Sequence, residues 1–389
     1  MNSQSPRTLF ENKNLRQGYA DPAVVRVLVG ILDEAIGSTK STSIREELKA
    51  VRAYLDGAKP TDCEGRAPDK RSFSHTEILN AFKLNDGPAV LRYLLYRYRY
   101  NVYPNTQTLG DFPIVLAVEP TSVCNLRCVM CFEADPSFTG DQSAMGYMDF
   151  GLYKSIIDEA AQHGLGSLIL ASRGEPTLHQ KLPEMIAYAR AADITEIKIN
   201  TNATMLTEAR SRRILAADPD LIVFSVDSAD KAQFEAIRVG ASFDEVVANI
   251  RSFNDVRHRE FPNGRTRTRI SMTIIGSQQD AVRAENFWSP LVDEFAVNQA
   301  IPKLFIYGLP KSPVERFCAL LWERLYVWWD GGVNVCDEDY KSRLSVGKLG
   351  DGATIKNIWL GDKMQAYRTI HASGQKNSLH PCDRCPGFS

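Results

Sequence analysis

The chain has 389 residues, of which 44% are hydrophobic and 24% are charged, and its formal net charge is −1. A chain of this length can bury a sizeable core, and we expect two or three domains. The near-zero net charge gives no electrostatic reason to expect a nucleic-acid or membrane partner. No apolar run approaches the length of a membrane span and no signal peptide stands at residues 1–17, so a cytoplasmic location is the default expectation.

The first region, residues 1–109, is predicted to be helical and separate from the rest. Apolar residues recur at helical spacing in residues 23–36 and 43–55, and a third helical pattern runs from His75 towards Tyr100. The Arg- and Tyr-rich run at residues 92–100 allows phosphate or nucleic-acid binding by charge and stacking. The pattern also predicts an amphipathic helix whose arginines face water or the neighbouring domain, which is our expectation.

Residues 110–310 alternate short apolar runs with helical patterns, which is typical of βαβ units and a parallel sheet. Six strands are expected, at residues 112–119, 167–171, 196–201, 221–226, 268–275 and 303–307. The intervening helices are expected at residues 151–163, 182–192, 208–216, 243–255 and 281–294. Six such units make an α/β fold, an open, partial (β/α)6 barrel, with all the carboxyl ends of its strands on one face.

Seven of the eight cysteines fall into two groups, and only Cys63 is left unassigned. Such clustering in a cytosolic chain indicates metal ligation rather than disulfides. The first group, Cys124, Cys128 and Cys131, follows the first predicted strand, where α/β folds place their chemistry. Three thiolates cannot complete a structural zinc site, but they can hold three irons of a [4Fe–4S] cluster and leave the fourth iron open. The alternatives are a zinc knuckle and three incidental cysteines.

This Cys-x3-Cys-x2-Cys spacing resembles the signature of the radical S-adenosylmethionine (SAM) enzymes. The resemblance implies that the open iron chelates the amino and carboxylate groups of SAM. It also implies that the reduced cluster cleaves SAM to methionine and a 5′-deoxyadenosyl radical, which abstracts a hydrogen atom from the substrate. An electron donor such as flavodoxin or ferredoxin would reduce the cluster. Met130 occupies the position before the last cysteine. In the family this residue is usually aromatic and contacts the adenine of SAM.

Two further motifs resemble SAM-binding motifs of this family. Gly174 and Glu175 are similar to part of a Gly-Gly-Glu-Pro motif whose backbone and acidic side chain receive the SAM amino group, with Arg173 in place of the first glycine. A plain Gly-Pro turn is the alternative. Asn202 lies in a sequence similar to the family's Thr-Asn-Gly turn.

The fourth predicted strand ends in a Ser-x-Asp sequence, Ser225 and Asp227, which in the family lies near the ribose and the substrate. Arg238 matches the arginine of a family motif that reaches the SAM carboxylate, a pairing for which a guanidinium is suited. The alternative is a solvated arginine on a helix.

The C-terminal region, residues 311–389, is rich in turns and holds the second cysteine group, which is Cys318, Cys336, Cys382 and Cys385. Residues 328–335 are predicted to form a hairpin with Asp-Gly at the turn. The region resembles the twitch domain, the shortened SPASM domain, which holds one auxiliary [4Fe–4S] cluster. Four cysteines ligate a cluster fully, which suits electron transfer, although a structural zinc site fits the same thiols.

The resemblance therefore implies a radical SAM oxidoreductase that acts on a C–H bond, most simply one next to a hydroxyl, and passes the following electron to the auxiliary cluster. The spacing of the second cysteine group is similar to that of aminocyclitol dehydrogenases, so a small sugar- or aminocyclitol-like substrate is expected. No residue can be assigned as the catalytic base from sequence.

One alternative is a peptide-modifying (RiPP) maturase, although residues 1–109 show no strand pattern for the winged-helix module that many of these carry. A second alternative is a non-catalytic iron–sulfur or zinc protein that binds nucleic acid through residues 92–100.

Overall fold

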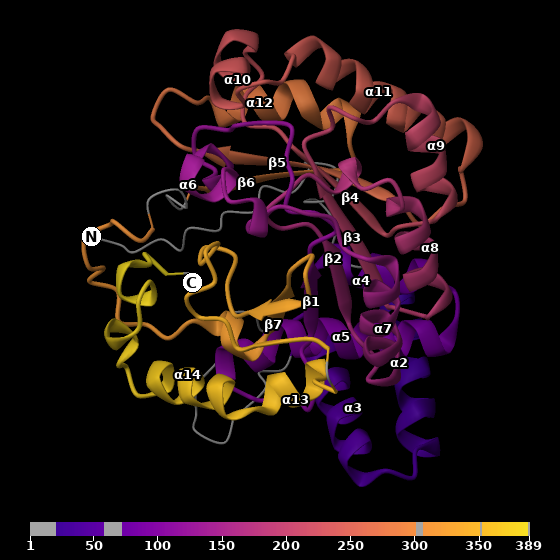
Figure 1. The fold of residues 1–389 in the computed structure, drawn as a ribbon. Coiled ribbons are helices and arrows are strands. Elements are labelled where there is room, and N and C mark those ends of the chain that lie inside the picture. The colour runs from indigo at the N-terminus through magenta and orange to yellow at the C-terminus, as the bar shows by residue number, and fades with distance from the viewer. Residues whose placement is uncertain (1–20, 58–71, 301–305, 351, 388–389) are drawn as a thin grey trace.

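The computed structural model describes residues 21–57, 72–300, 306–350 and 352–387 (Figure 1). Its centre is a nine-stranded sheet with the strand order β6-β5-β4-β3-β2-β1-β7-β8-β9. The strands are β1 Val115–Val118, β2 Ser167–Leu170, β3 Glu196–Thr201, β4 Leu221–Ser225, β5 Arg267–Ile274, β6 Glu294–Gln299, β7 Arg324–Val327, β8 Gly332–Asn334 and β9 Gly347–Lys348. The strands from β6 to β7 pair in parallel, whereas β8 and β9 are antiparallel.

Alternation along the barrel strands gives the sheet an apolar outer face and a more polar concave face. On β3, Ile197 and Ile199 belong to the main core, while Lys198 and Asn200 between them point to the opposite face. The outer face packs against a layer of helices, which curve around the top and right of Figure 1. These helices are α7 Phe150–Gln162, α8 Leu182–Ala191, α9 Glu208–Ala216, α10 Lys231–Ile237, α11 Phe243–Glu260 and α12 Ala281–Trp288. The predicted α/β architecture is confirmed.

The predicted sixth strand was wrong. Of residues 303–307, the first three lie outside the described residues, and Ile306 and Tyr307 form a turn. The sixth barrel strand is β6, and the helix expected to run to Glu294 ends at Trp288, before a short 3-10 turn that contains Pro290. Pairing with β5 over six residues decides this placement, and such a long-range contact leaves no periodic signal in the segment itself.

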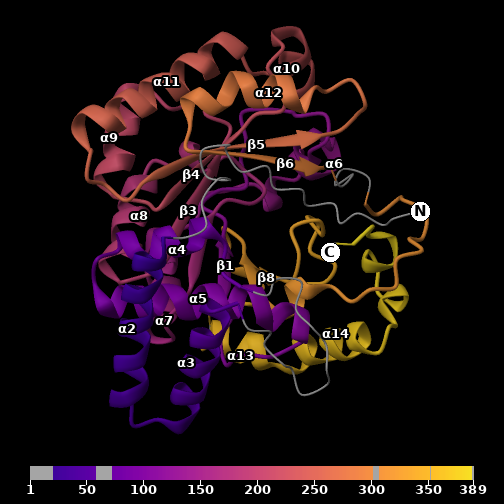
Figure 2. The same cartoon turned by 180° about the vertical axis from the view of Figure 1, so that it is seen from behind.

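In the described residues, four helices precede the barrel: α2 Pro22–Ser38, α3 Thr42–Leu55, α4 His75–Lys83 and α5 Gly87–Thr106. The single pattern expected from His75 to Tyr100 is two helices, because Asn85 adopts a left-handed backbone (φ 50°) and the Asp86 side chain then caps α5. Figure 2 shows α5 running beneath the barrel strands.

The Arg- and Tyr-rich run lies in α5 and is mostly covered by neighbouring elements. Tyr93, Tyr96 and Tyr98 are buried, and the Tyr96 hydroxyl donates to the Glu196 carboxylate at 2.9 Å, at the start of β3. Arg97 pairs with Glu77 of α4 at 2.6 Å. The expectation that the arginines face water or the neighbouring domain is confirmed for Arg92, which lies 3.5 Å from Asp193 of the barrel, but is wrong for Arg97, which pairs within the N-terminal region. The buried tyrosines are not a stacking surface for nucleic acid.

The C-terminal region extends the barrel sheet. β7 pairs in parallel with β1, and β8 returns antiparallel to it through a turn in which Gly331 has φ 84°, as the predicted hairpin requires. Helices α13 Ile355–Leu360 and α14 Asp362–Ala372 pack below this hairpin (Figure 1). The sequence did not predict the strand pairing that joins the two regions.

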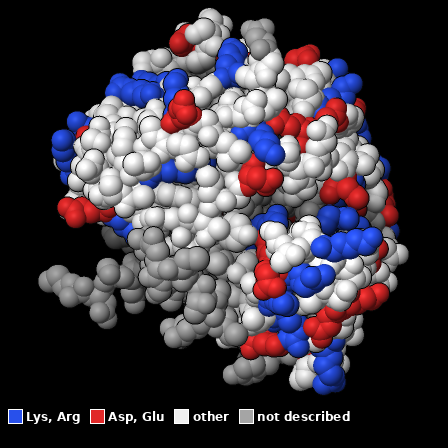
Figure 3. All heavy atoms as spheres, turned by 90° about the horizontal axis from the view of Figure 1, so that it is seen from below, with Lys and Arg blue, Asp and Glu red and all other residues white. Residues whose placement is uncertain are grey.

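The molecular surface carries charges of both signs (Figure 3). On the side seen in Figure 3, acidic and basic side chains are interspersed, in line with surface ion pairs such as Lys49–Glu46 and Arg52–Asp33. In the described part of the chain, no helix has the length and apolar character needed to span a bilayer.

Candidate active site

The three cysteines of the first group lie in the loop after β1. Cys128 is buried, whereas Cys124 and Cys131 are partly exposed. The backbone of this loop pairs with the segment after α10, since the Arg127 amide donates to the Val239 carbonyl at 2.9 Å and the Val129 amide donates to the Ile237 carbonyl at 3.0 Å. These bonds hold the middle of the cysteine loop to a segment about 110 residues away in sequence, between Arg127 and Ile237.

The loop after β2 lies directly against the cysteine loop. A Cβ atom on Gly174 would stand 2.3 Å from the Thr121 carbonyl oxygen and 2.5 Å from that of Val123. The Glu175 amide donates to the same Val123 carbonyl at 2.9 Å. Glycine is therefore required at position 174 by the close approach of two backbones.

The Glu175 carboxylate, which is 3% exposed, joins the loops after β2 and β3. Its Oε1 accepts from the Thr177 amide at 3.0 Å and from the Thr201 hydroxyl at 2.7 Å, and its Oε2 accepts from the Asn202 amide at 2.7 Å. The Asn202 side chain in turn donates to Asn125 Oδ1, inside the cysteine loop, at 3.0 Å. Within the part of the chain that the structure describes, Oε2 accepts this one bond and retains capacity for another donor.

Arg238 is buried, which rules out the alternative of a solvated arginine on a helix. Its Nε lies 2.7 Å from Asp227 Oδ2, in an ion pair without hydrogen-bond geometry, and its Nη1 lies 4.0 Å from the Cys128 sulfur. The Thr273 amide donates to the other Asp227 oxygen at 2.8 Å. Asp227 is therefore already held by two groups, while Ser225, two residues earlier on the same face, is half-buried.

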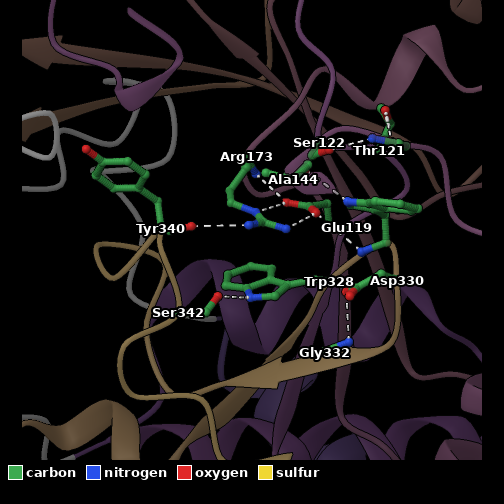
Figure 4. A network of polar contacts seen from close by, with 12 residues as sticks. Glu119, Thr121, Ser122, Ala144, Arg173, Trp328, Asp330, Gly332, Tyr340 and Ser342 are labelled. Atoms are coloured by element: carbon green, nitrogen blue, oxygen red, sulfur yellow. Dashed lines mark hydrogen bonds and ion pairs between the residues drawn. The ribbon is translucent and has the colours of Figure 1, made fainter. Parts of the chain in front are cut away.

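A buried ion pair that the sequence did not reveal connects the barrel to the C-terminal region (Figure 4). Arg173 Nε and Nη2 donate to the two oxygens of Glu119 at 2.8 and 2.7 Å, and Nη1 donates to the Tyr340 carbonyl at 3.2 Å. The guanidinium carbon lies 4.2 Å from the ring centroid of Trp328, beside the turn of the β7–β8 hairpin. Position 173, where the family motif has glycine, thus serves to bind β1, β2 and β7 together.

The four C-terminal cysteines line one small cavity of about 40 Å³. Burial raises the pKa of every one of these thiols, that of Cys318 to about 12, so that without iron they are neutral. Among the described residues, no group of three or more Cys, His, Asp or Glu side chains is spaced to hold a single metal ion. Four thiols around one cavity can supply the complete set of ligands for a [4Fe–4S] cluster or for a structural zinc ion.

A hydrophobic cluster of three aromatic side chains and one isoleucine lies between the two cysteine groups. It consists of Phe132, Phe138, Ile306 and Tyr340, with Cys131 and Cys385 packed against it from opposite groups. Phe132, the neighbour of Cys131, stacks on Tyr340 with ring centroids 4.9 Å apart and an interplanar angle of 16°. The two sites are therefore parts of one packed unit.

Comparison with known proteins places this geometry in a family. The profile of the Radical SAM superfamily matches residues 118–276, which span the cysteine loop and the strand-end loops described above, and that of the SPASM iron-sulfur cluster-binding domain matches residues 318–386. The chain belongs to the radical SAM superfamily. Its two domains imply [4Fe–4S] clusters and SAM as cofactors.

The curated relatives match over only part of their length. The tungsten-containing aldehyde ferredoxin oxidoreductase cofactor-modifying protein of Pyrococcus furiosus is 33% identical over 119 residues, which cover 30% of this radical SAM chain and 32% of that protein. The mycofactocin maturase MftC of Mycolicibacterium smegmatis is 28% identical over 174 residues, which cover 44% of this chain and 40% of the maturase. The matched stretch thus spans about a third to two fifths of these relatives.

Among solved structures, that of Streptococcus suis SuiB bound to precursor peptide SuiA superimposes with a TM-score of 0.53 at 13% identity, and covers 94% of this chain and 87% of SuiB. At this identity the likeness establishes the shared fold alone.

Proposed function

We propose that this radical SAM enzyme oxidises a small, sugar-like substrate that binds in the concave face of the sheet. The observation that carries this proposal is the packing of a four-cysteine cavity against the three-cysteine loop through the Phe132–Tyr340 stack. An electron acceptor beside the active site is what a net oxidation requires.

The two cysteine groups are proposed to have different tasks. Cys124, Cys128 and Cys131 would hold the SAM-binding cluster, and the four cysteines of the C-terminal cavity would hold the auxiliary cluster. With both clusters bound, the first supplies the electron that cleaves SAM to a 5′-deoxyadenosyl radical, and the second accepts the electron that the substrate loses.

The chain's own residues would bind and orient SAM around the cysteine loop. The residues proposed to do so lie at or just after the carboxyl ends of the strands, in the cysteine loop or, for the last of them, directly after α10: Met130, Gly174, Glu175, Asn202, Ser225, Asp227 and Arg238. Glu175 would use the remaining capacity of Oε2 for the SAM amino group. Arg238, already paired with Asp227 next to Cys128, would act chiefly by adding positive charge beside the cluster.

The number of clusters tests the proposal directly. After anaerobic reconstitution we expect about eight irons per chain in the wild type, and about four both in a variant with the three first-group cysteines changed to alanine and in one with the four C-terminal cysteines changed to alanine. Iron, sulfide and zinc content would be measured together with release of 5′-deoxyadenosine.

The two variants serve as controls for each other. Loss of the first group should abolish SAM cleavage, whereas loss of the second group should leave SAM cleavage and remove net oxidation of the substrate. A wild type with about four irons and bound zinc would overturn the dehydrogenase proposal, because no acceptor would remain for the electron.

A peptide-modifying maturase is the second candidate, favoured by the match to the maturase MftC. The two candidates predict different substrates for one assay. A panel of sugars and polyols would stimulate 5′-deoxyadenosine release by the proposed dehydrogenase, whereas only a precursor peptide would do so for a maturase.

A further inference from the structure

Lys198 lies in the middle of β3 and points to the concave face of the sheet. Its neighbours Ile197 and Ile199 are buried in the outer core, so the alternation of the strand directs Lys198 inward. Among the described residues, Lys198 has no hydrogen-bond or ion-pair partner. A lysine left unpaired in a partly buried position costs free energy, so its place calls for an explanation.

The other charged side chains on this part of the concave face have partners. Arg269 Nε donates to Glu294 at 2.6 Å, Arg267 also pairs with Glu294, and Arg324 pairs with Glu323. Glu196 accepts from Tyr96 at 2.9 Å and lies 3.8 Å from Arg267. Lys198 is therefore an excess positive charge within an otherwise balanced set.

The charges that act on Lys198 come from both sides of the concavity. Burial is the largest of the causes that lower the pKa of Lys198 to about 8; the positive charges of Arg269 on β5 and Arg324 on β7 also lower it, and the negative charges of Glu196 and Glu294 oppose them. In the sheet, β3 is separated from β7 by β2 and β1 and from β5 by β4. The amino group of Lys198, which strand alternation directs into the concavity, therefore lies near positive charges on both sides and near the carboxylates of Glu196 and Glu294.

A second unpartnered polar atom lies on the same face between Lys198 and the cysteine loop. Asn200 Oδ1 is buried without a hydrogen-bond partner among the described residues. Two residues further along the strand, Asn202 bonds to Asn125 of the cysteine loop. At about 3.3 Å per residue, Lys198 and Asn202 are roughly 13 Å apart along β3, so Lys198 lies deeper in the concave face than the cysteine loop.

We propose that Lys198 binds an anionic group of the substrate, a carboxylate or a phosphate, on the concave face of the sheet. Asn200, which lies nearer the cysteine loop on β3, binds a hydrogen-bond donor of the same substrate. The inference rests on the proposed function, because it takes the concave face to be the substrate chamber. An ammonium group on the substrate would meet the excess positive charge of Lys198. The substrate is therefore an acidic or phosphorylated sugar rather than an aminocyclitol.

Competitive lysine labelling tests this assignment without turnover. The reconstituted full chain with SAM would be labelled with a trace of fluorodinitrobenzene from pH 6.5 to 10, and each lysine read by mass spectrometry. The probes are inorganic phosphate and acetate, with inositol as a neutral polyol and sodium chloride at equal ionic strength as controls. Lys363, exposed on α14, is the reference lysine.

We expect phosphate, acetate or both to slow the labelling of Lys198 about tenfold near pH 7, which corresponds to a rise of about one pKa unit, and to leave Lys363 unchanged. A response to phosphate alone assigns a phosphorylated substrate, and a response to acetate alone a carboxylated one. No response to either anion, or an equal response to inositol or chloride, overturns the proposal.

Variants give an independent measurement. Phosphate or acetate should raise the melting temperature of the wild type and of Lys363→Gln, but not that of Lys198→Gln, which should fold because it loses an unpaired charge. Stabilisation that persists in Lys198→Gln would overturn the inference. An enzyme that binds anions at Lys198 but oxidises nothing would contradict only the proposed function, whereas efficient oxidation of an uncharged sugar, unaffected by Lys198→Gln, would contradict only the inference.

Discussion

Replacing Arg173 by methionine is expected to lower the free energy of unfolding by about 3 to 5 kcal/mol, the usual result of removing one partner from a buried ion pair. Arg173 is 6% exposed and its partner Glu119 is fully buried. Without the guanidinium, the hydrogen-bond donors that remain for the Glu119 carboxylate among the described residues are the backbone amides of residue 173 and of Trp329. The contact to the Tyr340 carbonyl and the stacking on Trp328 are lost as well.

The measurement is anaerobic urea denaturation of the reconstituted protein, followed by tryptophan fluorescence. Arg212→Met is the matched control, since Arg212 pairs with Glu208 and Glu260 on the surface and a much smaller change is expected there. The double variant Glu119→Leu/Arg173→Met should recover part of the stability, because it leaves no isolated buried charge. A single variant as stable as the control would show that this ion pair does not hold the two regions together.

Gly174→Ala is expected to remove the cluster of the cysteine loop and leave the other in place, so that iron falls from about eight to about four per chain. The added methyl group would meet backbone atoms of residues 121–123 at 2.3 to 2.7 Å, and these precede Cys124 directly. Because backbone cannot rotate out of the way as a flexible side chain does, the cysteine loop itself must shift. We expect 5′-deoxyadenosine release to fall by a factor of 100 or more, since a displacement of about 1 Å near a reacting centre has effects of this size.

Iron and sulfide analysis after anaerobic reconstitution measures the first effect, and a chromatographic assay of 5′-deoxyadenosine measures the second. Gly30→Ala is a suitable control, because a Cβ at position 30 has no neighbour within 4 Å. If Gly174→Ala retained about eight irons and full SAM cleavage, the close approach of the two loops would not be needed for the site.

The sequence by itself determined the parts of this protein that depend on local pattern. The spacing of Cys124, Cys128 and Cys131 after an apolar run, and the alternation of strand and helix patterns that follows, predicted the family and the barrel. The hairpin turn at Asp330 and Gly331 was equally readable, because the chemistry of a tight turn resides in adjacent residues. These elements are specified by neighbouring residues, and the tertiary structure contains them where the local pattern predicts them.

The tertiary structure decided which residues meet across long distances in sequence. It placed β6 at Glu294–Gln299 and paired β7 with β1. It also showed that Arg173, which stands where the family motif has glycine, forms a buried ion pair with Glu119. It also buried Arg238 against Asp227 and brought the charges of Arg269 and Arg324 to Lys198. The physical reason is the same in each case. Strand periodicity fixes the face on which a side chain lies, but its partners depend on which strands become neighbours, and that is set by packing of the whole chain.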